Sequence, residues 1–249
     1  MNLLDNPFSL KGKTIFVTGA SSGIGRGIAV ACSKMGANLI INGRNEEKLN
    51  ETLSLLLGEC LPIIGDLTDK NIIEKIVESI PKLDGIVYCA GIGNRVLCKN
   101  ITEQDIIQMM DTNFKAPVML QTEILRHKKL NRGGSIVFIA SIANESPSIG
   151  NALYAASKGA VISYANCLKL ELAPRLIRVN CISPAMVWTD LIYKGGVTEE
   201  QLREDERNYP LKRYGTPEDI ANLAVFLLSD ASVWMTGSNV RITGGGELG

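Results

Sequence analysis

The chain has 249 residues, 45% of them hydrophobic and 21% charged, which is enough for a sizeable globular core. Lys plus Arg and Asp plus Glu both total 26, so the charge balance gives no reason to expect nucleic acid or an anionic membrane as a partner. The one histidine, His127, lies in a short basic stretch away from other candidate groups. This excludes a Ser-His-Asp hydrolase and a histidine-containing zinc site.

No segment is apolar over a length that would predict a signal peptide or a membrane span. The cysteines show no CxxC spacing and no histidine partner; they are Cys32, Cys60, Cys89, Cys98, Cys167 and Cys181. This pattern predicts unpaired, buried thiols in a reducing compartment, with no bound metal. We therefore expect a cytoplasmic protein.

Short apolar runs alternate with helix-length amphipathic segments along the chain. The predicted strands are 14–18, 38–42, 60–65, 85–89, 135–140, 178–183 and 239–242, and the predicted helices are 23–35, 46–57, 70–80, 102–130, 154–172 and 217–229. Strand–helix alternation of this kind predicts an α/β fold with right-handed crossovers. We expect a single-domain, doubly wound Rossmann fold over 1–249, whose mainly parallel, seven-stranded sheet has helices on both faces.

One long stretch, 183–210, follows the sixth strand and shows no regular pattern. Ligands of open α/β sheets bind beyond the carboxyl ends of the strands, and loops of this length inside a compact domain are often functional. We predict that residues 183–210 form a lid over the substrate.

A glycine-rich turn joins the first strand to the first helix, as TGASSGIG at 18–25. Gly19 suits the tight turn, Gly23 lets the main chain approach a pyrophosphate, and Gly25 lets the helix pack against the strand. The helix N-terminus then offers N–H groups to the phosphates. The predicted dinucleotide contacts here are Gly19, Ser21, Ser22, Gly23, Ile24 and Gly25.

The end of the second strand carries Arg44 where an NAD site usually has a carboxylate. Arg44 can pair with a 2′-phosphate, so NADP(H) is favoured over NAD(H). The alternative is that Arg44 is a solvated loop residue with no role in cofactor binding. Asp66, after the third strand, is placed to accept from the adenine amino group, with Leu67 against the ring. The other reading of Asp66 is a helix N-cap, a role that Thr68 or Asp69 suits better.

Three side chains have the chemistry and spacing for carbonyl reduction. Ser141 follows the fifth strand, Tyr154 lies thirteen residues later, and Lys158 is one helical turn beyond Tyr154. Tyrosine has an ordinary pKa near 10. A nearby ammonium group and a charged nicotinamide ring would lower this pKa, so that Tyr154 could act as acid and base. The Ser141 hydroxyl could hold the substrate oxygen.

These motifs resemble the short-chain dehydrogenase/reductase family over almost the whole chain. The resemblance rests on TGASSGIG at 18–25, Asp66, CAG at 89–91, Asn113, Ser141, YAASK at 154–158, SPAMVWT at 183–189 and Gly244-Gly245. It implies that Tyr154 is the acid/base, that Lys158 tunes it and binds the nicotinamide ribose, and that Asn113 helps to hold a relay water. It further implies cofactor contacts at Cys89, Ala90, Gly91, Pro184, Val187 and Thr189.

The chain departs from the family pattern at two positions. Cys89 stands where an asparagine is usual, so polar support there must come from the backbone or be absent, and Ala185 replaces a glycine. Neither change removes a group from the reaction.

The tail from Tyr209 to Asp230 is similar to that of 3-oxoacyl-(acyl carrier protein) reductases, which implies a small carbonyl or alcohol substrate, with a 3-oxoacyl thioester as the first choice. A sugar or polyol dehydrogenase is the second reading, and a non-catalytic dinucleotide-binding redox sensor is a third. Apolar side chains in the lid favour an apolar substrate; they are Met186, Val187, Trp188, Leu191, Ile192 and Tyr193. Polar side chains near the expected pocket, outside the lid, favour a polar one; they are Asn94, Arg95, Asn144 and Glu145. The resemblance also implies a homotetramer, which the small apolar residues Ala155, Ala160, Val161 and Ala165 would suit as well as core packing.

Overall fold

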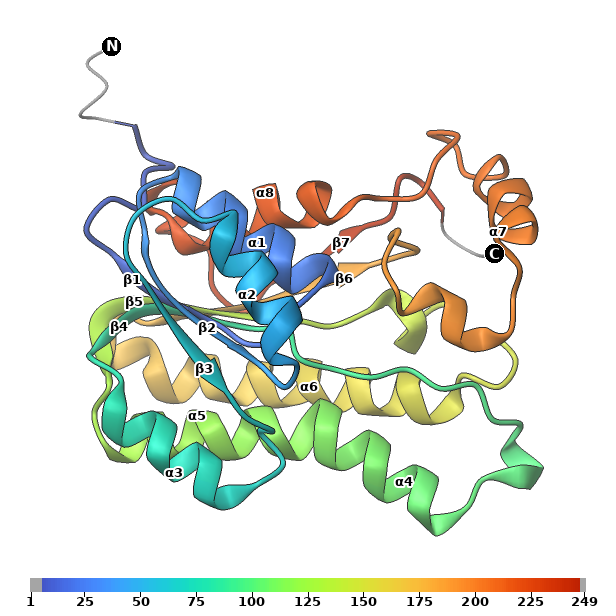
Figure 1. Cartoon of the computed structure of the whole chain (residues 1–249), viewed down its shortest axis with the longest axis horizontal. Helices are drawn as coiled ribbons and strands as arrows, with labels where there is room; N and C mark the ends of the chain where they lie inside the picture. Colours follow the sequence, from blue (N-terminus) through green and yellow to red (C-terminus); the bar gives the residue numbers. More distant parts are fainter. Residues whose placement is uncertain (1–5, 247–249) are drawn as a thin grey trace.

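The computed structural model describes residues 6–246, so the ends of the predicted 1–249 domain lie outside the described part. All seven strands of this part join one parallel sheet in the order β3-β2-β1-β4-β5-β6-β7 (Figure 1), which confirms the predicted doubly wound fold. The strands are β1 (Thr14–Val17), β2 (Asn38–Gly43), β3 (Cys60–Ile64), β4 (Leu83–Tyr88), β5 (Leu130–Ile139), β6 (Arg178–Pro184) and β7 (Asn239–Ile242).

Helices cover both faces of the sheet, and one further helix stands apart (Figure 1). One face carries α1 (Gly23–Lys34), α2 (Glu46–Ser54) and α8 (Pro217–Leu228), and the other carries α3 (Lys70–Ser79), α4 (Glu103–Met110), α5 (Ala116–Arg126) and α6 (Ala152–Leu172). The remaining helix, α7 (Glu199–Glu206), lies at one end of the molecule, beyond the strand tips.

Each central strand contributes to two cores, because alternate side chains point to opposite faces of a sheet. In β5, Ile136 and Phe138 are buried against α3, α5 and α6, while Val137 and Ile139 are buried against α1 and α8. This explains why the strand is apolar at every position, since neither face is open to water.

The predicted helix 102–130 is wrong in its continuity and its end. The chain forms α4, then a π-helical turn over Asp111–Lys115, and then α5, which ends at Arg126. Lys128 has φ +53°, a left-handed conformation that stops the helix, and β5 already begins at Leu130. Pro117, inside the predicted helix and in the first turn of α5, was a readable sign that a new helix begins there.

The stretch 183–210 is also more ordered than predicted, because it contains α7. Thr198 caps this helix in a capping box with Gln201: its hydroxyl accepts from the Gln201 N–H, and the Gln201 side chain accepts from the Thr198 N–H. Arg203 then pairs along the helix with Glu199 and Glu206. The capping box was a readable signal in the sequence, so this helix could have been predicted.

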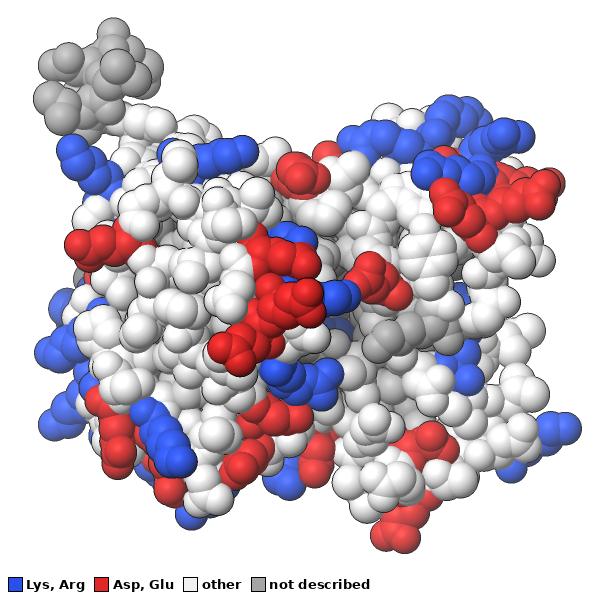
Figure 2. All heavy atoms as spheres, in the orientation of Figure 1, with Lys and Arg blue, Asp and Glu red and all other residues white. Residues whose placement is uncertain are grey.

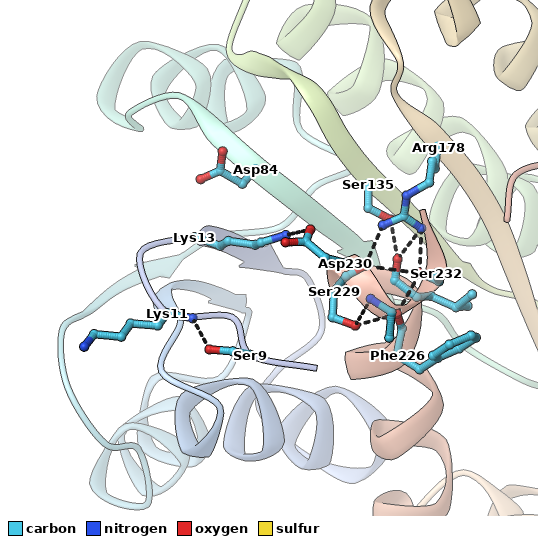
Figure 3. Close-up of polar contacts among 12 residues, drawn as sticks. Ser9, Lys11, Lys13, Asp84, Ser135, Arg178, Phe226, Ser229, Asp230 and Ser232 are labelled. Atoms are coloured by element: carbon cyan, nitrogen blue, oxygen red, sulfur yellow. Dashed lines mark hydrogen bonds and ion pairs between the residues drawn. The ribbon is translucent and has the colours of Figure 1, made fainter. Parts of the chain in front are cut away.

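A buried arginine holds the end of α8 to the sheet (Figure 3). Arg178, at the start of β6, donates to the carbonyl of Leu227 at 2.7 Å, to the carbonyl of Ser229 at 3.1 Å and to the hydroxyl of Ser232 at 2.8 Å. Ser135 of β5 donates to the same Leu227 carbonyl at 2.7 Å. The guanidinium therefore joins β5, β6 and the segment after α8 in one network.

The surface carries both charge signs, and Figure 2 shows them intermingled on one face, with a mixed group of acidic and basic side chains around α7. Within residues 6–246, no helix is long and apolar enough to cross a membrane. The prediction of buried thiols holds for Cys32 and Cys181 but is wrong for Cys98 and Cys167, which are exposed. Those two lie on a surface turn and on the outer side of α6, which the spacing of cysteines could not indicate.

Candidate functional site

A cleft of about 900 Å³ opens at the carboxyl ends of the strands. It lies where the strand order reverses between β1 and β4, the usual ligand position in this topology. Every predicted cofactor contact lines this cleft, as do Ser141, Tyr154 and Lys158. Asn113 is the one predicted site residue that does not line it.

The glycine turn lines the cleft and leaves no room for a side chain at Gly19 or Gly25. Gly19 has φ +68°, and a Cβ on it would lie 2.7 Å from the Ala90 main chain at the end of β4. A Cβ on Gly25 would lie 2.2 Å from the carbonyl oxygen of Gly19. Both positions therefore require glycine for a close approach between main-chain segments, as the motif predicted.

Two serines of this turn fit a phosphate-bearing ligand. The hydroxyl oxygen of Ser21 is buried without a hydrogen-bond partner among the described residues, although it lies on the cleft wall. Ser22 is the N-cap of α1 but makes no side-chain cap bond. The N–H groups of the first turn of α1 are therefore available to a ligand anion, which suits the pyrophosphate of a dinucleotide.

The adenosine end of the cleft has an ion pair that the sequence did not indicate. Arg44 lies 3.4 Å from a carboxylate oxygen of Asp66, and Asp66 also accepts from the main chain and hydroxyl of Thr68. Burial of Asp66 works against its charge, but the bonds from Thr68 and the Arg44 cation keep the pKa of Asp66 below its ordinary value. Asp69, and not Asp66, caps α3, as the sequence favoured.

Thr18 supplies the polar support that Cys89 cannot. Its hydroxyl accepts from the N–H of Cys89 at 3.1 Å and from the N–H of Ala90 at 3.2 Å, which joins the ends of β1 and β4. Burial raises the pKa of the Cys89 thiol to about 12, so it stays protonated. The departure at Cys89 therefore leaves the junction of the two strands intact.

Tyr154 and Lys158 lie side by side on α6, with Ser141 facing them from the loop after β5. The Lys158 ammonium nitrogen is 5.8 Å from the centre of the Tyr154 ring and donates to the carbonyl of Ile139 at 2.8 Å. The hydroxyl of Ser141 is a hydrogen-bonding neighbour of the Tyr154 phenol. The expected constellation of hydroxyl, phenol and ammonium is present in one wall of the cleft.

In the protein without a bound nicotinamide, the pKa of Tyr154 lies above its ordinary value. Burial raises the pKa above its ordinary value, and the hydrogen bond with Ser141 only partly offsets this. Burial also lowers the pKa of Lys158, because it disfavours the ammonium form. In the protein alone the phenol is therefore strongly protonated, and the predicted lowering would have to come from the charge of a bound ligand.

Asn113 lies behind the cleft, in the π-helical turn between α4 and α5. Its side-chain oxygen accepts from the N–H of Ile92 at 2.8 Å, while its amide donates to the Ile92 carbonyl at 2.9 Å and to the Ser157 hydroxyl at 3.0 Å. A Cβ on Gly91 would lie 3.2 Å from Asn113 and 3.4 Å from the Lys158 nitrogen. Asn113 thus ties the loop after β4 to α6, beside the lysine.

The lid and α7 form the other wall of the cleft; the sequence predicted the lid but missed the helix within it. An apolar cluster fixes α7 to the lid; it contains Leu202, Tyr209 and Tyr214, with Ala185, Met186, Trp188, Ile192 and Val197 around them. Of the predicted lid residues, Met186, Val187, Leu191 and Ile192 line the cleft, whereas Trp188 faces α7 and donates to Glu206 at 2.9 Å. Among the predicted polar residues, Asn94 and Arg95 line the cleft, whereas Asn144 and Glu145 do not.

The lid also reaches the cofactor side of the cleft. A Cβ on Gly23 would lie 3.0 Å from the methyl carbon of Thr189, and Asp190 pairs with Lys48 of α2 at 3.2 Å. The two partners of this ion pair are 142 residues apart in the chain. The lid is therefore placed across the region where the glycine turn would hold a pyrophosphate.

Comparisons of the sequence and of the structure with known proteins agree on one family. The family model described as enoyl-(acyl carrier protein) reductase matches residues 19–247. The chain is 37% identical over 236 residues to the 3-oxoacyl-(acyl-carrier-protein) reductase FabG of Rickettsia felis, a match that covers 95% of this chain and 97% of that protein. It is 34% identical over 246 residues to the NAD-dependent glycerol dehydrogenase of Listeria innocua, covering 97% and 96% of the two chains.

A solved structure from Beutenbergia cavernae superimposes with a TM-score of 0.85 at 33% identity and covers 96% of this chain and 98% of its own. It is assigned as an NAD(P)-dependent gluconate 5-dehydrogenase and holds NADP at low occupancy. The similar proteins thus include thioester, polyol and sugar-acid enzymes on one fold.

Proposed function

Because this chain belongs to the short-chain dehydrogenase/reductase family, and is thus a nicotinamide-dependent oxidoreductase of CH–OH and C=O groups, we propose that it is an NADP(H)-dependent reductase of a small carbonyl compound. The observation that carries the proposal is that Ser141, Tyr154 and Lys158 line the same cleft as the glycine turn. The bound nicotinamide would supply the hydride. The protein would supply the proton and hold the substrate oxygen.

In this proposal Tyr154 is the proton donor in reduction and the base in alcohol oxidation. Ser141 positions the substrate oxygen beside the phenol, which a hydroxyl already in hydrogen-bonding contact with Tyr154 can do without moving far. Lys158, held by the Ile139 carbonyl at 2.8 Å, places its positive charge beside the tyrosine and can bind a ribose hydroxyl. Asn113 positions the loop after β4 rather than contacting the substrate.

We take a 3-oxoacyl thioester as the first candidate substrate, supported by the similarity to the Rickettsia felis reductase and by the apolar lid residues Met186, Val187, Leu191 and Ile192 on the cleft wall. A sugar or polyol is the second candidate, supported by the similar glycerol and gluconate enzymes and by Asn94, Ser148 and Asn151 on the cleft wall. An acyl chain needs an apolar channel, whereas a sugar needs hydrogen-bonding partners for its hydroxyls.

A substrate panel tests the proposed function. NADPH and NADH are first titrated by fluorescence, and the oxidation of each is then followed at 340 nm with acetoacetyl thioesters, ketoses and keto acids. Reduction of thioesters in preference to sugars would support the first candidate, and the reverse preference the second. Binding of NADPH without turnover of any carbonyl compound would contradict the reductase proposal and favour a dinucleotide sensor.

Arg44 is expected to select the phosphorylated cofactor. Replacing it in Arg44→Gln removes a charge that can pair with a 2′-phosphate, so the Kd of NADPH should rise about tenfold, while that of NADH should hardly change. Fluorescence titration of both cofactors measures this. Arg126→Gln, at the exposed end of α5, is the matched control and should alter neither value. An equal effect of Arg44→Gln on both cofactors would contradict the role.

The two directions of the reaction should differ in pH dependence. Reduction needs the protonated phenol, which predominates below the pKa of Tyr154, and burial places that pKa above its ordinary value. We therefore expect carbonyl reduction to vary little from about pH 6 to 9, while alcohol oxidation, which needs the phenolate, rises with pH over the same range. Initial rates in both directions, with saturating cofactor, test this. A reduction rate that increases with pH would exclude Tyr154 as the acid.

We further propose a homotetramer, as in the resemblance noted above. Val161 and Ala165 do not support it, because both are buried in the core beneath α6. Support comes instead from exposed apolar side chains on two helices, Ile106 and Ile107 on α4 and Leu170 on α6, which are 45%, 43% and 70% exposed. Light scattering of the purified protein measures the assembly directly.

A further inference from the structure

One cation on the cleft wall stands without a partner. Arg44 and Lys48 pair with carboxylates, and Lys158 donates to a main-chain carbonyl. Arg95 also lines the cleft, but within residues 6–246 its guanidinium has no hydrogen bond, ion pair or aromatic contact. Its guanidinium is therefore the one cationic group of the described cleft wall that no other protein group engages.

Arg95 lies close to the proposed reaction centre along the chain. The loop after β4 begins at Gly91, where a Cβ would lie 3.4 Å from the Lys158 nitrogen. Four residues of extended chain span at most about 14 Å, so the Arg95 backbone lies within that distance of Gly91. A ligand with its carbonyl group at Tyr154 could therefore place a second group at Arg95.

The loop that carries Arg95 is held between two other parts of the site. Its Gly93 faces the lid, since a Cβ there would lie 3.3 Å from Leu191. On the other side, the N–H of Val96 donates to the Gly150 carbonyl at 2.8 Å, and the Arg95 Cβ lies 3.5 Å from where a Gly150 side chain would begin. The main chain at Arg95 is thus held between the lid and the segment that leads into α6, and the exposed Arg95 side chain lies at the mouth of the cleft.

The acidic side chains of the cleft do not neutralise this charge. Asp66 and Asp190 are paired with Arg44 and Lys48. Asp205 keeps its charge, since it accepts from the uncharged Tyr214 hydroxyl, but it lies on α7 and forms no ion pair with Arg95. The described cleft lining has four cationic side chains, Arg44, Lys48, Arg95 and Lys158, against these three carboxylates, so it keeps a net positive charge that favours an anion. A guanidinium binds carboxylate and phosphate groups through two parallel N–H donors, which gives orientation as well as affinity.

We propose that Arg95 binds an anionic group of the substrate, a carboxylate or a phosphate, and so selects charged carbonyl compounds. This inference rests on the proposed function and narrows its substrate class. The carboxylate of a keto sugar acid and the phosphates of a carrier-linked thioester share this chemistry. The carbonyl is reduced at Tyr154 while the anion is held at the mouth of the cleft.

Three substrates test the inference: 5-ketogluconate carries a carboxylate, acetoacetyl-coenzyme A carries phosphates, and S-acetoacetyl-N-acetylcysteamine is neutral. In Arg95→Gln, the KM of the anionic substrate that the wild type prefers should rise about tenfold, with kcat, cofactor KM and the neutral thioester unchanged. Arg95→Lys should recover part of the loss. Lys99→Gln, an exposed cation on the same loop but outside the cleft, is the matched control and should change nothing.

The outcomes separate this inference from the function on which it rests. If the wild type reduces carbonyl compounds but Arg95→Gln affects charged and neutral substrates alike, or affects neither, the anion site is wrong and the reductase proposal stands. If the wild type reduces no carbonyl compound while binding NADPH, both are wrong. Comparison of the two anionic substrates then tells carboxylate from phosphate.

Discussion

Replacing Tyr154 by phenylalanine should lower kcat for carbonyl reduction by roughly 10²–10⁴-fold, the usual contribution of a positioned general acid. The variant loses one hydroxyl and leaves the ring in place, so the packing of α6 and the binding of NADPH should persist. Single-turnover absorbance at 340 nm, together with fluorescence titration of the cofactor, measures the two quantities separately. A loss of turnover with unchanged cofactor affinity is the expected result.

Tyr164→Phe is the matched control for this prediction. Tyr164 lies ten residues further along the same helix, where its ring makes edge contacts with Phe114 and Phe138 away from the cleft. Its hydroxyl has no role in the proposed reaction, so turnover should stay close to that of the wild type. If Tyr154→Phe and Tyr164→Phe retain equal activity, Tyr154 is not the proton donor and the reductase mechanism must use another group.

Replacing Arg178 by methionine should destabilise the fold by about 3 kcal/mol or more, because buried acceptors lose a charged donor. Methionine keeps much of the length of the side chain, so the main loss is the set of bonds to Leu227, Ser229 and Ser232 (Figure 3). For a chain of this size, that corresponds to a fall in Tm of about 6–12 °C. Thermal unfolding followed by circular dichroism measures it.

Two further variants show how much of the expected loss of stability comes from the guanidinium of Arg178. Arg126→Met removes an exposed arginine that pairs with Glu123 on the surface of α5, and it should change stability by less than about 0.5 kcal/mol. Arg178→Lys keeps the positive charge but not the two-armed guanidinium, so it should fall between the wild type and Arg178→Met. A Tm for Arg178→Met within 2 °C of the control, against the about 6–12 °C expected, would show that the network contributes little to stability.

Much of the fold and of the candidate site could be read from local patterns. Continuous apolar runs predict strands that are buried on both faces, and β5 has this pattern because Ile136 and Val137 enter different cores. Gly19 and Gly25 were identifiable because their positions between a strand and a helix leave no room for a side chain. Tyr154 and Lys158 were identifiable because a spacing of four residues places them on one face of a helix.

Other features depend on contacts between distant segments, which no local pattern reports. The Arg44–Asp66 and Lys48–Asp190 pairs join residues 22 and 142 positions apart; the first forms where β2 and β3 end side by side, and the second where the lid meets α2. The burial of Tyr154, which raises the pKa of its phenol in the protein alone, is a further feature that the spacing of residues does not report.

The sequence by itself determined the parallel α/β fold, the glycine turn and the trio Ser141, Tyr154 and Lys158, because each depends on residues that are near one another in the chain or follow a strand end. Only the tertiary structure decided what surrounds that trio. It placed α7 against the lid and left Arg95 unpaired at the mouth of the cleft. The reason is physical: the reacting groups follow from spacing along single elements, whereas the shape and charge of the substrate pocket arise where several elements meet.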